Sequence, residues 1–143
     1  MINAVDLALK NFCVQILGLE NIQARYIGKN LYGAAIALCA NEKEYQWYLL
    51  FQKETLNIFS KALLFDDDLS EDDLDDLCKE IANMIIGSAK VTLEQNENSH
   101  LHYTLGVPEF LGRIDNTNSL HLDDIFVYKI KNRTFLIGRK LEI

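Results

Sequence analysis

The stretch from Asp76 to Gly87 places three polar side chains and a glycine at the spacing of one helix face. At about 100° per residue, Asp76, Glu80, Asn83 and Gly87 form a single stripe. The opposite side of the same helix is apolar and consists of Leu74, Leu77, Ile81, Met84 and Ile85. A carboxylate and a carboxamide are therefore expected one turn apart beside a buried face.

The chemistry open to this pair is positioning rather than proton transfer. The carboxamide of Asn83 is a poor acid or base, but it both donates and accepts hydrogen bonds. It can therefore hold a water molecule in line with a phosphorus atom, and phosphoryl transfer depends mainly on positioning and charge stabilisation. The Glu80 carboxylate would find a cation on a partner, because a partly desolvated charge-assisted pair is stronger than a surface pair.

Two residues of the stripe are poor choices for a helix interior. The side chain of Asn83 competes for backbone hydrogen bonds, and Gly87 costs about 1 kcal/mol relative to alanine. Exposed helix faces are polar by default, so the spacing alone also fits an ordinary solvated surface. The residues around the stripe are needed to distinguish a functional site from an ordinary solvated helix face.

The string from Glu80 to Lys90 resembles the signature helix of the CheC/CheX family of chemotaxis phosphatases. In that family, Asp-x3-Glu-x2-Asn is followed by a small-residue Gly-x-Ala-Lys exit from the helix, and this chain has both parts of the pattern. Val107-Pro108 is similar to the Leu-Pro that follows a family strand. The order of elements agrees along most of the chain, so the resemblance implies a single CheX-like domain over residues 1–143.

The resemblance also implies a partner and a role for each site residue. In the family the helix docks on the phosphorylated receiver protein CheY, a response regulator. Carried over, Glu80 contacts the active-site lysine of the receiver and Asn83 places the hydrolytic water, which makes these two the expected catalytic residues. The expected partner-binding residues are Asp76, Glu80, Asn83 and Gly87. The aspartyl phosphate and Mg²⁺ belong to the receiver, so this chain is expected to need no cofactor.

Only one such motif fits the sequence. Some family members carry a second motif in their first helix, but the first glutamate of this chain is Glu20, beyond Gly18. A single site resembles the CheX subgroup, whose members are dimers. Two other classes stay open at this point: a non-catalytic module that binds a receiver, as a related fold does in flagellar switch proteins, and a structural homodimer with a fortuitous motif.

Composition favours one soluble domain in the cytoplasm. The content of 49% hydrophobic and 24% charged residues is ordinary for a globular protein. The longest apolar runs fall well short of the roughly 20 residues that span a bilayer, and the N-terminus lacks the basic region of a signal peptide. The net charge of −7 argues against nucleic acid as a partner.

The acidity is concentrated in one segment. Asp66 to Asp76 holds eight acidic residues and no basic one, whereas the rest of the chain has 13 acidic and 14 basic residues. Ser70 followed by Asp73 has the form of a capping box, so the signature helix is expected to begin near Glu71 and to end near Ser88. The heavy acidic lead-in exceeds what the family pattern requires.

Hydrophobic periodicity predicts the remaining elements. Helices are expected over residues 3–18 and 53–65, and a β-hairpin over Leu31–Cys39 and Tyr45–Gln52. Later strands are expected at Ala89–Gln95, Leu101–Val107, Ile125–Lys131 and Thr134–Ile143, with a turn at residues 131–133 and a polar loop around residues 115–119.

This order predicts an α+β domain with helices on one face of a largely antiparallel sheet. The C-terminal strands are apolar on both faces, because Phe126 and Tyr128 alternate with Ile125 and Val127. Such strands need cover on both sides, from helices or from a second copy. Together with the CheX resemblance, this pattern predicts a homodimer formed through the C-terminal sheet.

Other candidate sites are weak. Cys13, Cys39 and Cys78 are too widely spaced for a disulfide framework or a zinc site. The acidic run lacks the glycine and the final glutamate of a calcium loop, since Glu71 and Leu77 occupy those positions. His100 and His102 would share a strand face, but no third ligand is evident.

Overall fold

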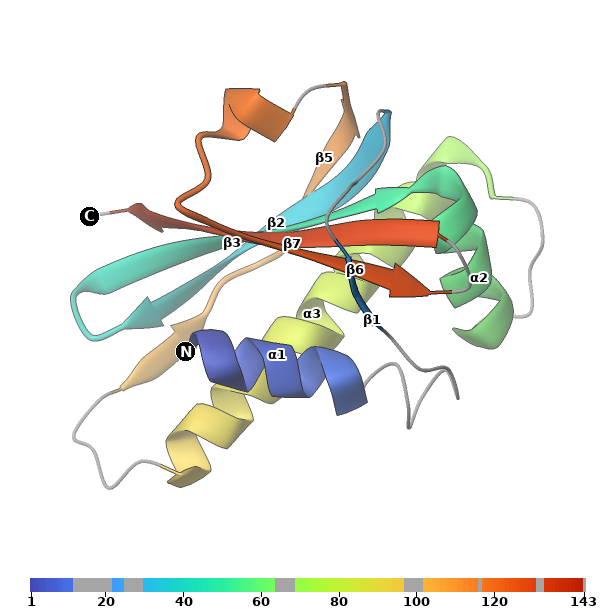
Figure 1. Ribbon diagram of the computed structural model, residues 1–143. Coiled ribbons are helices and arrows are strands. Elements are labelled where there is room, and N and C mark those ends of the chain that lie inside the picture. Colours follow the sequence, from blue (N-terminus) through green and yellow to red (C-terminus); the bar gives the residue numbers. More distant parts are fainter. Residues whose placement is uncertain are drawn as a thin grey trace.

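The computed structural model of the protein describes residues 1–11, 22–24, 30–63, 69–96, 102–115, 117–130 and 133–142. Figure 1 shows the chain path. In chain order the elements are α1 (Ile2–Asn11), β1 (Ile22–Ala24), β2 (Leu31–Ala40), β3 (Lys43–Gln52), α2 (Lys53–Leu63), α3 (Glu71–Asn96), β4 (Tyr103–Leu105), β5 (Glu109–Ile114), the 3-10 helix η2 (Thr117–Leu120), β6 (Asp124–Ile130) and β7 (Arg133–Glu142).

The strands form one antiparallel sheet in the order β1-β6-β7-β3-β2-β4, with β5 also paired to β2. β2 therefore meets two partners along its outer edge: β4 pairs with Leu38–Ala40, and β5 pairs with Leu31–Ala35. Helices α1 and α3 cross one face of the sheet (Figure 1). The predicted α+β class and antiparallel sheet are confirmed.

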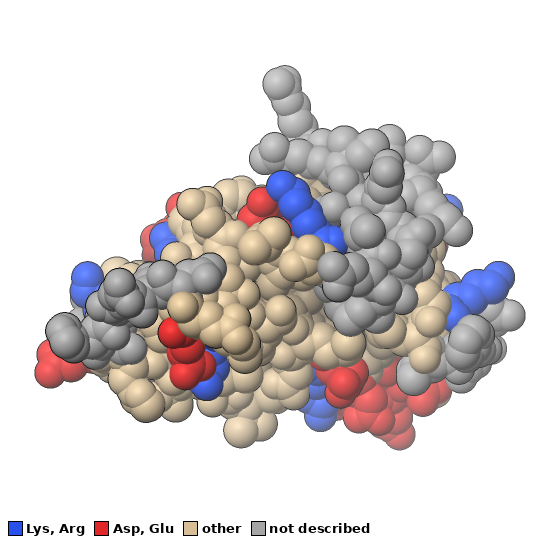
Figure 2. Space-filling view, turned by 90° about the horizontal axis from the view of Figure 1, so that it is seen from below, with Lys and Arg blue, Asp and Glu red and all other residues tan. Residues whose placement is uncertain are grey.

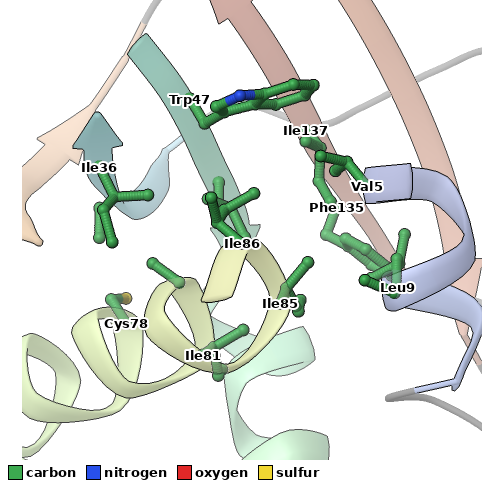
Figure 3. Packing of buried hydrophobic residues seen from close by; sticks show 14 of the residues in the cluster. Val5, Leu9, Ile36, Trp47, Cys78, Ile81, Ile85, Ile86, Phe135 and Ile137 are labelled. Atoms are coloured by element: carbon green, nitrogen blue, oxygen red, sulfur yellow. The ribbon is translucent and has the colours of Figure 1, made fainter. Parts of the chain in front are cut away.

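The main core lies between the helices and the sheet. Fully buried aromatic rings of Phe51, Phe59 and Phe135 come from β3, α2 and β7, with ring centroids 5.4 to 5.6 Å apart. Figure 3 shows Val5 and Leu9 of α1 approaching the same core as the isoleucines of α3. The two helices are thus fixed to the sheet by a common apolar layer.

A second, smaller cluster covers the opposite face of the sheet. Its buried members are Leu31, Leu50 and Leu136, and the partly buried side chains packed on them are Leu111, Ile114, Leu120, Leu122 and Val127. Because Val127 belongs to this cluster while Tyr128 belongs to the main core, β6 is apolar on both faces as the sequence predicts. Part of the cover on the outer face comes from the chain itself, through η2 and the residues that follow it.

Several predicted elements agree with the structure and one does not. The hairpin is confirmed as β2 and β3, and the strands Ile125–Lys131 and Thr134–Ile143 correspond to β6 and β7. The predicted strand Ala89–Gln95 is wrong, because these residues continue α3 to Asn96. The predicted helix end near Ser88, with Gly-x-Ala-Lys as the exit, is wrong for the same reason.

The physical cause of this error is the burial of residues after the glycine. Ala89 and Leu93 are buried and continue the apolar stripe of α3, while Val91 is 51% exposed. Lys90 and Glu94 form an ion pair of 2.8 Å, one helical turn apart. The alternation of Val91 and Leu93 that suggested a strand is therefore part of a helical pattern.

Other differences concern short elements. The sequence did not predict β1 or β5, and the loop expected around residues 115–119 contains η2. The strand expected at Leu101–Val107 is the shorter β4. The parts of the first helix beyond Asn11, and of the second beyond Leu63, lie outside the described residues, as do Cys13, Asp66–Asp68, His100 and the tip of the turn at residues 131–132. No helix in the described ranges is both long and apolar enough to cross a membrane.

Candidate functional site

The candidate site lies on α3, whose start is fixed by a capping box. The backbone N–H of Asp73 donates to Ser70 Oγ at 3.2 Å, and the backbone N–H of Ser70 donates to Asp73 Oδ2 at 3.1 Å. The backbone N–H of Leu74 then bonds to the Ser70 carbonyl at 3.0 Å. The predicted cap is confirmed, and acidic residues in the first turn complement the helix dipole.

The rotation of α3 about its axis is set by its buried face. Six apolar residues between Leu77 and Ile86 are at most 2% exposed: Leu77, Cys78, Ile81, Ala82, Ile85 and Ile86. Figure 3 shows Ile81, Ile85 and Ile86 projecting from α3 into the core. Because this face is locked, the stripe on the other side has one orientation.

The predicted stripe is present on the outer side of α3. Asp76, Glu80 and Asn83 are exposed, and Gly87 is half-buried. Within the described part of the chain, the side chains of Asp76, Glu80 and Asn83 make no hydrogen bond or ion pair. Their polar atoms are thus available to solvent or to a partner.

Gly87 lies beside the end of β4. A Cβ atom at this position would lie 3.6 Å from Leu105 Cδ2, which is ordinary van der Waals contact. The chain then leaves β4 through Gly106, whose N–H donates to the Ala37 carbonyl at 2.8 Å, and Val107, which is 88% exposed. Alanine would fit at Gly87, so the fold itself does not require glycine there.

A shallow pocket of about 490 Å³ opens beside the stripe. Its lining residues are Leu63 from the end of α2 and Asp76, Leu77, Glu80 and Met84 from α3. The structure therefore joins two of the predicted partner-binding residues to an apolar hollow, while Asn83 and Gly87 lie outside it. The sequence gives no signal for Leu63, since its proximity depends on how α2 packs against α3.

Lys79, the lysine of α3 that is nearest to Glu80 in sequence, already forms an ion pair. The Nζ of Lys79 lies 2.7 Å from Asp75 Oδ1, one turn earlier. The hydrogen bond with Asp75, together with the negative charges of Asp75 and Asp76, raises the pKa of Lys79 despite partial desolvation. The ammonium of Lys79 is thus paired with Asp75. The carboxylates of Asp76 and Glu80 have no ion-pair partner among the described residues and can accept a cation of a partner protein.

The thiol of Cys78 lies directly behind the site and is fully buried. Burial, with a smaller contribution from the charge of Asp75, raises its pKa to about 12. A neutral thiol in the core is a packing group rather than a nucleophile. No group of His, Cys, Asp and Glu side chains able to hold a metal ion occurs among the described residues.

The fold is shared with solved CheX and CheC-like structures. The chain aligns with chemotaxis protein CheX from Vibrio vulnificus with a TM-score of 0.79 and 16% identity, covering 99% of this chain and 95% of that one. CheX from Desulfovibrio desulfuricans gives a TM-score of 0.72 and 19% identity, with 98% and 97% covered. The Borrelia burgdorferi structure, a CheX-CheY-BeF3-Mg²⁺ complex, gives 0.70 and 13% identity, with 99% and 97% covered.

The sequence itself matches a family model. The model for the chemotaxis phosphatase CheX covers residues 33–129, which include nearly all of the hairpin, the whole of α3, β4, β5 and nearly all of β6, but not β7. No curated protein sequence matches the chain. The protein belongs to the CheX family, which confirms the resemblance seen in the signature helix.

Proposed function

We propose that this chain hydrolyses the aspartyl phosphate of a CheY-like receiver, with Asn83 orienting the attacking water and Glu80 docking on the receiver's active-site lysine. One observation carries the proposal: Glu80 and Asn83 are exposed on a rigid helix and have no internal partner among the described residues. An exposed carboxamide fixed on a packed helix supplies the positioning that phosphoryl transfer requires.

The proposed chemistry divides the work between the two proteins. The receiver brings the acyl phosphate and Mg²⁺, so charge stabilisation comes from its side. This chain supplies a hydrogen-bonding group that holds water in line and a carboxylate that fixes the docking angle. That CheX from Borrelia burgdorferi was crystallised with CheY, BeF3 and Mg²⁺ supports a receiver as the partner class.

The test is to mix the protein with candidate phosphorylated receivers and to follow loss of the acyl phosphate. The wild-type chain is expected to accelerate that loss, and Asn83→Ala is expected to abolish the acceleration. Ser88→Ala, an exposed change on the same helix, serves as the matched control and should behave like wild type. Full activity of Asn83→Ala would remove the proposed mechanism.

The same experiment separates an enzyme from a binding module. Binding to a receiver carrying BeF3⁻, which mimics the phosphoryl group, without any acceleration of phosphate loss would identify a module that only binds. Absence of both binding and acceleration with every cognate receiver would overturn the proposed function.

We further propose that the protein forms a homodimer through its C-terminal sheet. Ile125 on β6 is 51% exposed and lies on the same outer face as Val127 and Leu136, whereas Leu141 on β7 is 40% exposed on the helix side of the sheet. The outer cluster around Leu136 covers only part of the sheet. The exposed Ile125 beside the outer cluster supports burial of this outer face against a second copy.

A further inference from the structure

The pocket beside Glu80 combines two kinds of surface. Its apolar part is formed by Leu63, Leu77 and Met84, contributed by two helices that meet only through folding. Among the described residues, its polar part consists of the carboxylates of Asp76 and Glu80, one helical turn apart. A ligand that fills the hollow must therefore place apolar atoms inside and satisfy negative charge nearby.

Charge favours a cationic occupant. Asp76 and Glu80 have no ion pair with any described residue, and the ammonium of Lys79 is held by Asp75 at 2.7 Å. Figure 2, which looks onto the helix side of the molecule, shows acidic side chains gathered where α3 begins. The local field is therefore negative, and it would attract a basic side chain and repel an acidic one.

We propose that this pocket receives a lysine or arginine side chain of the receiver other than its active-site lysine. The alkyl stem lies on Leu63, Leu77 and Met84, and the charged head meets Asp76. This inference rests on the proposed function, which reserves Glu80 for the active-site lysine and leaves Asp76 without a partner. Asp76 and Leu63 thereby determine which receivers are bound.

Long basic side chains suit both parts of the pocket. Lysine and arginine bury their methylene groups on apolar surface while keeping the charged head in a polar environment. A purely apolar side chain would fill the hollow but would desolvate two carboxylates without compensation. An acidic side chain would meet like charge. The mixed lining therefore selects the basic class.

The first test measures affinity for a receiver loaded with BeF3⁻ and Mg²⁺. Asp76→Asn and Leu63→Ala are each expected to raise the dissociation constant by about five- to tenfold, and the double variant by less than the product of the two. Glu42→Gln and Val91→Ala change an exposed acid in the turn between β2 and β3 and an exposed apolar residue far along α3, so they should bind like wild type. Wild-type affinity for both pocket variants would overturn the proposal.

The second test needs no receiver. Met84 lines the pocket, and the chain has two methionines, so ¹³C-methyl methionine labelling yields one signal at the site and one at Met1 as an internal reference. The probe n-pentylammonium is expected to shift the Met84 signal saturably and to leave Met1 unmoved. Asp76→Asn should weaken this response. An equal response to n-pentanol, or none to n-pentylammonium, would contradict a site for basic side chains.

The two tests distinguish failure of this inference from failure of the proposed function. If receivers are dephosphorylated while the Met84 signal does not respond to n-pentylammonium and the pocket variants bind normally, the proposed function is supported and the pocket inference is wrong. If no receiver is bound or dephosphorylated although Met84 responds to n-pentylammonium, the assignment of the occupant to a receiver falls together with the proposed function.

Discussion

The side chain of Leu122 lies against Gly138 so closely that a Cβ atom at Gly138 would overlap Leu122 Cδ1 and lie 3.2 Å from Leu122 Cγ. Gly138 is in the middle of β7, paired with Tyr48 on one side and Ile125 on the other. Leu122 follows η2 and belongs to the outer cluster. The glycine therefore makes room for the segment that covers part of the sheet's outer face.

This contact predicts that Gly138→Ala destabilises the fold. The added methyl group must displace Leu122, and overpacking of this kind costs about 1 to 3 kcal/mol in free energy of unfolding. The double variant with Gly138→Ala and Leu122→Ala should regain part of the stability that Leu122→Ala alone loses. Urea unfolding of the four proteins gives the comparison. A Gly138→Ala protein as stable as wild type would show that Leu122 moves aside without cost.

Gly87→Ala is expected to have the opposite effect on stability. The new Cβ meets Leu105 at an ordinary contact distance, and alanine is a better helix former by about 1 kcal/mol. If Gly87 allows close approach of a receiver, the same variant should bind the phosphorylated receiver more weakly. Raised stability with unchanged affinity would remove Gly87 from the partner surface.

Glu80→Lys should weaken receiver binding by at least about tenfold, because it sets two positive charges against each other. Glu42→Lys, the same charge change at the exposed turn between β2 and β3, is the matched control and should change affinity little. Titration of both variants with the BeF3⁻-loaded receiver measures the difference. Equal affinities would mean that Glu80 does not face a cation.

The buried thiol of Cys78 predicts a loss of stability at high pH. Its pKa is raised from 9.0 to about 12 by burial and then by the charge of Asp75. Between these values the folded state keeps a proton that the unfolded state releases, so the free energy of unfolding falls as pH rises, by up to about 1.4 kcal/mol per pH unit. Below pH 9 the contribution is fully present.

The measurement is urea unfolding between pH 8 and pH 11 for wild type and Cys78→Ala. The alanine variant is expected to be less stable at pH 8, because it loses packing in the core, and to show a shallower decline above pH 9. Parallel declines for the two proteins would show that Cys78 does not cause the pH dependence.

Sedimentation at micromolar concentration is expected to show a dimer of the 16.4 kDa chain. Ile125→Asp should shift the distribution toward monomer, because it places a charge on the exposed apolar part of β6. Leu7→Asp, the same kind of change at an exposed apolar residue of α1 on the helix side, is the matched control. A single 16.4 kDa species for the wild-type protein would contradict the dimer.

Sequence patterns predicted those parts of the fold that depend on interactions between residues close together in the chain. The Ser70 and Asp73 pair fixed the start of α3, and alternation around a polar turn fixed the hairpin. The end of α3 depends on the burial of Ala89 and Leu93 beneath the sheet, which is a tertiary effect that outweighs the cost of Gly87. The short strand β5 forms because the edge of β2 is free to pair beyond β4, and no local pattern reports this.

The site divides in the same way. The stripe of Asp76, Glu80 and Asn83 is visible in the sequence because helical periodicity needs no knowledge of the fold. The pocket is not, because Leu63 reaches it only through the packing of α2 on α3. Likewise, the space around Gly87 depends on Leu105, a residue distant in the chain.

The single uninterrupted helix α3 imposes a phase on the whole site. The cap at Ser70, the buried apolar face and the polar stripe are all counted along one 26-residue helix. Deleting or inserting one residue between Leu74 and Glu80 would turn everything beyond it by about 100° relative to the cap. If the cap stayed in place, the isoleucines would turn away from the core together with Glu80 and Asn83. If the isoleucines stayed buried, the cap and Leu74 would turn out of their positions instead. Substitutions can therefore accumulate along α3, but the number of residues between the cap and Glu80 cannot change.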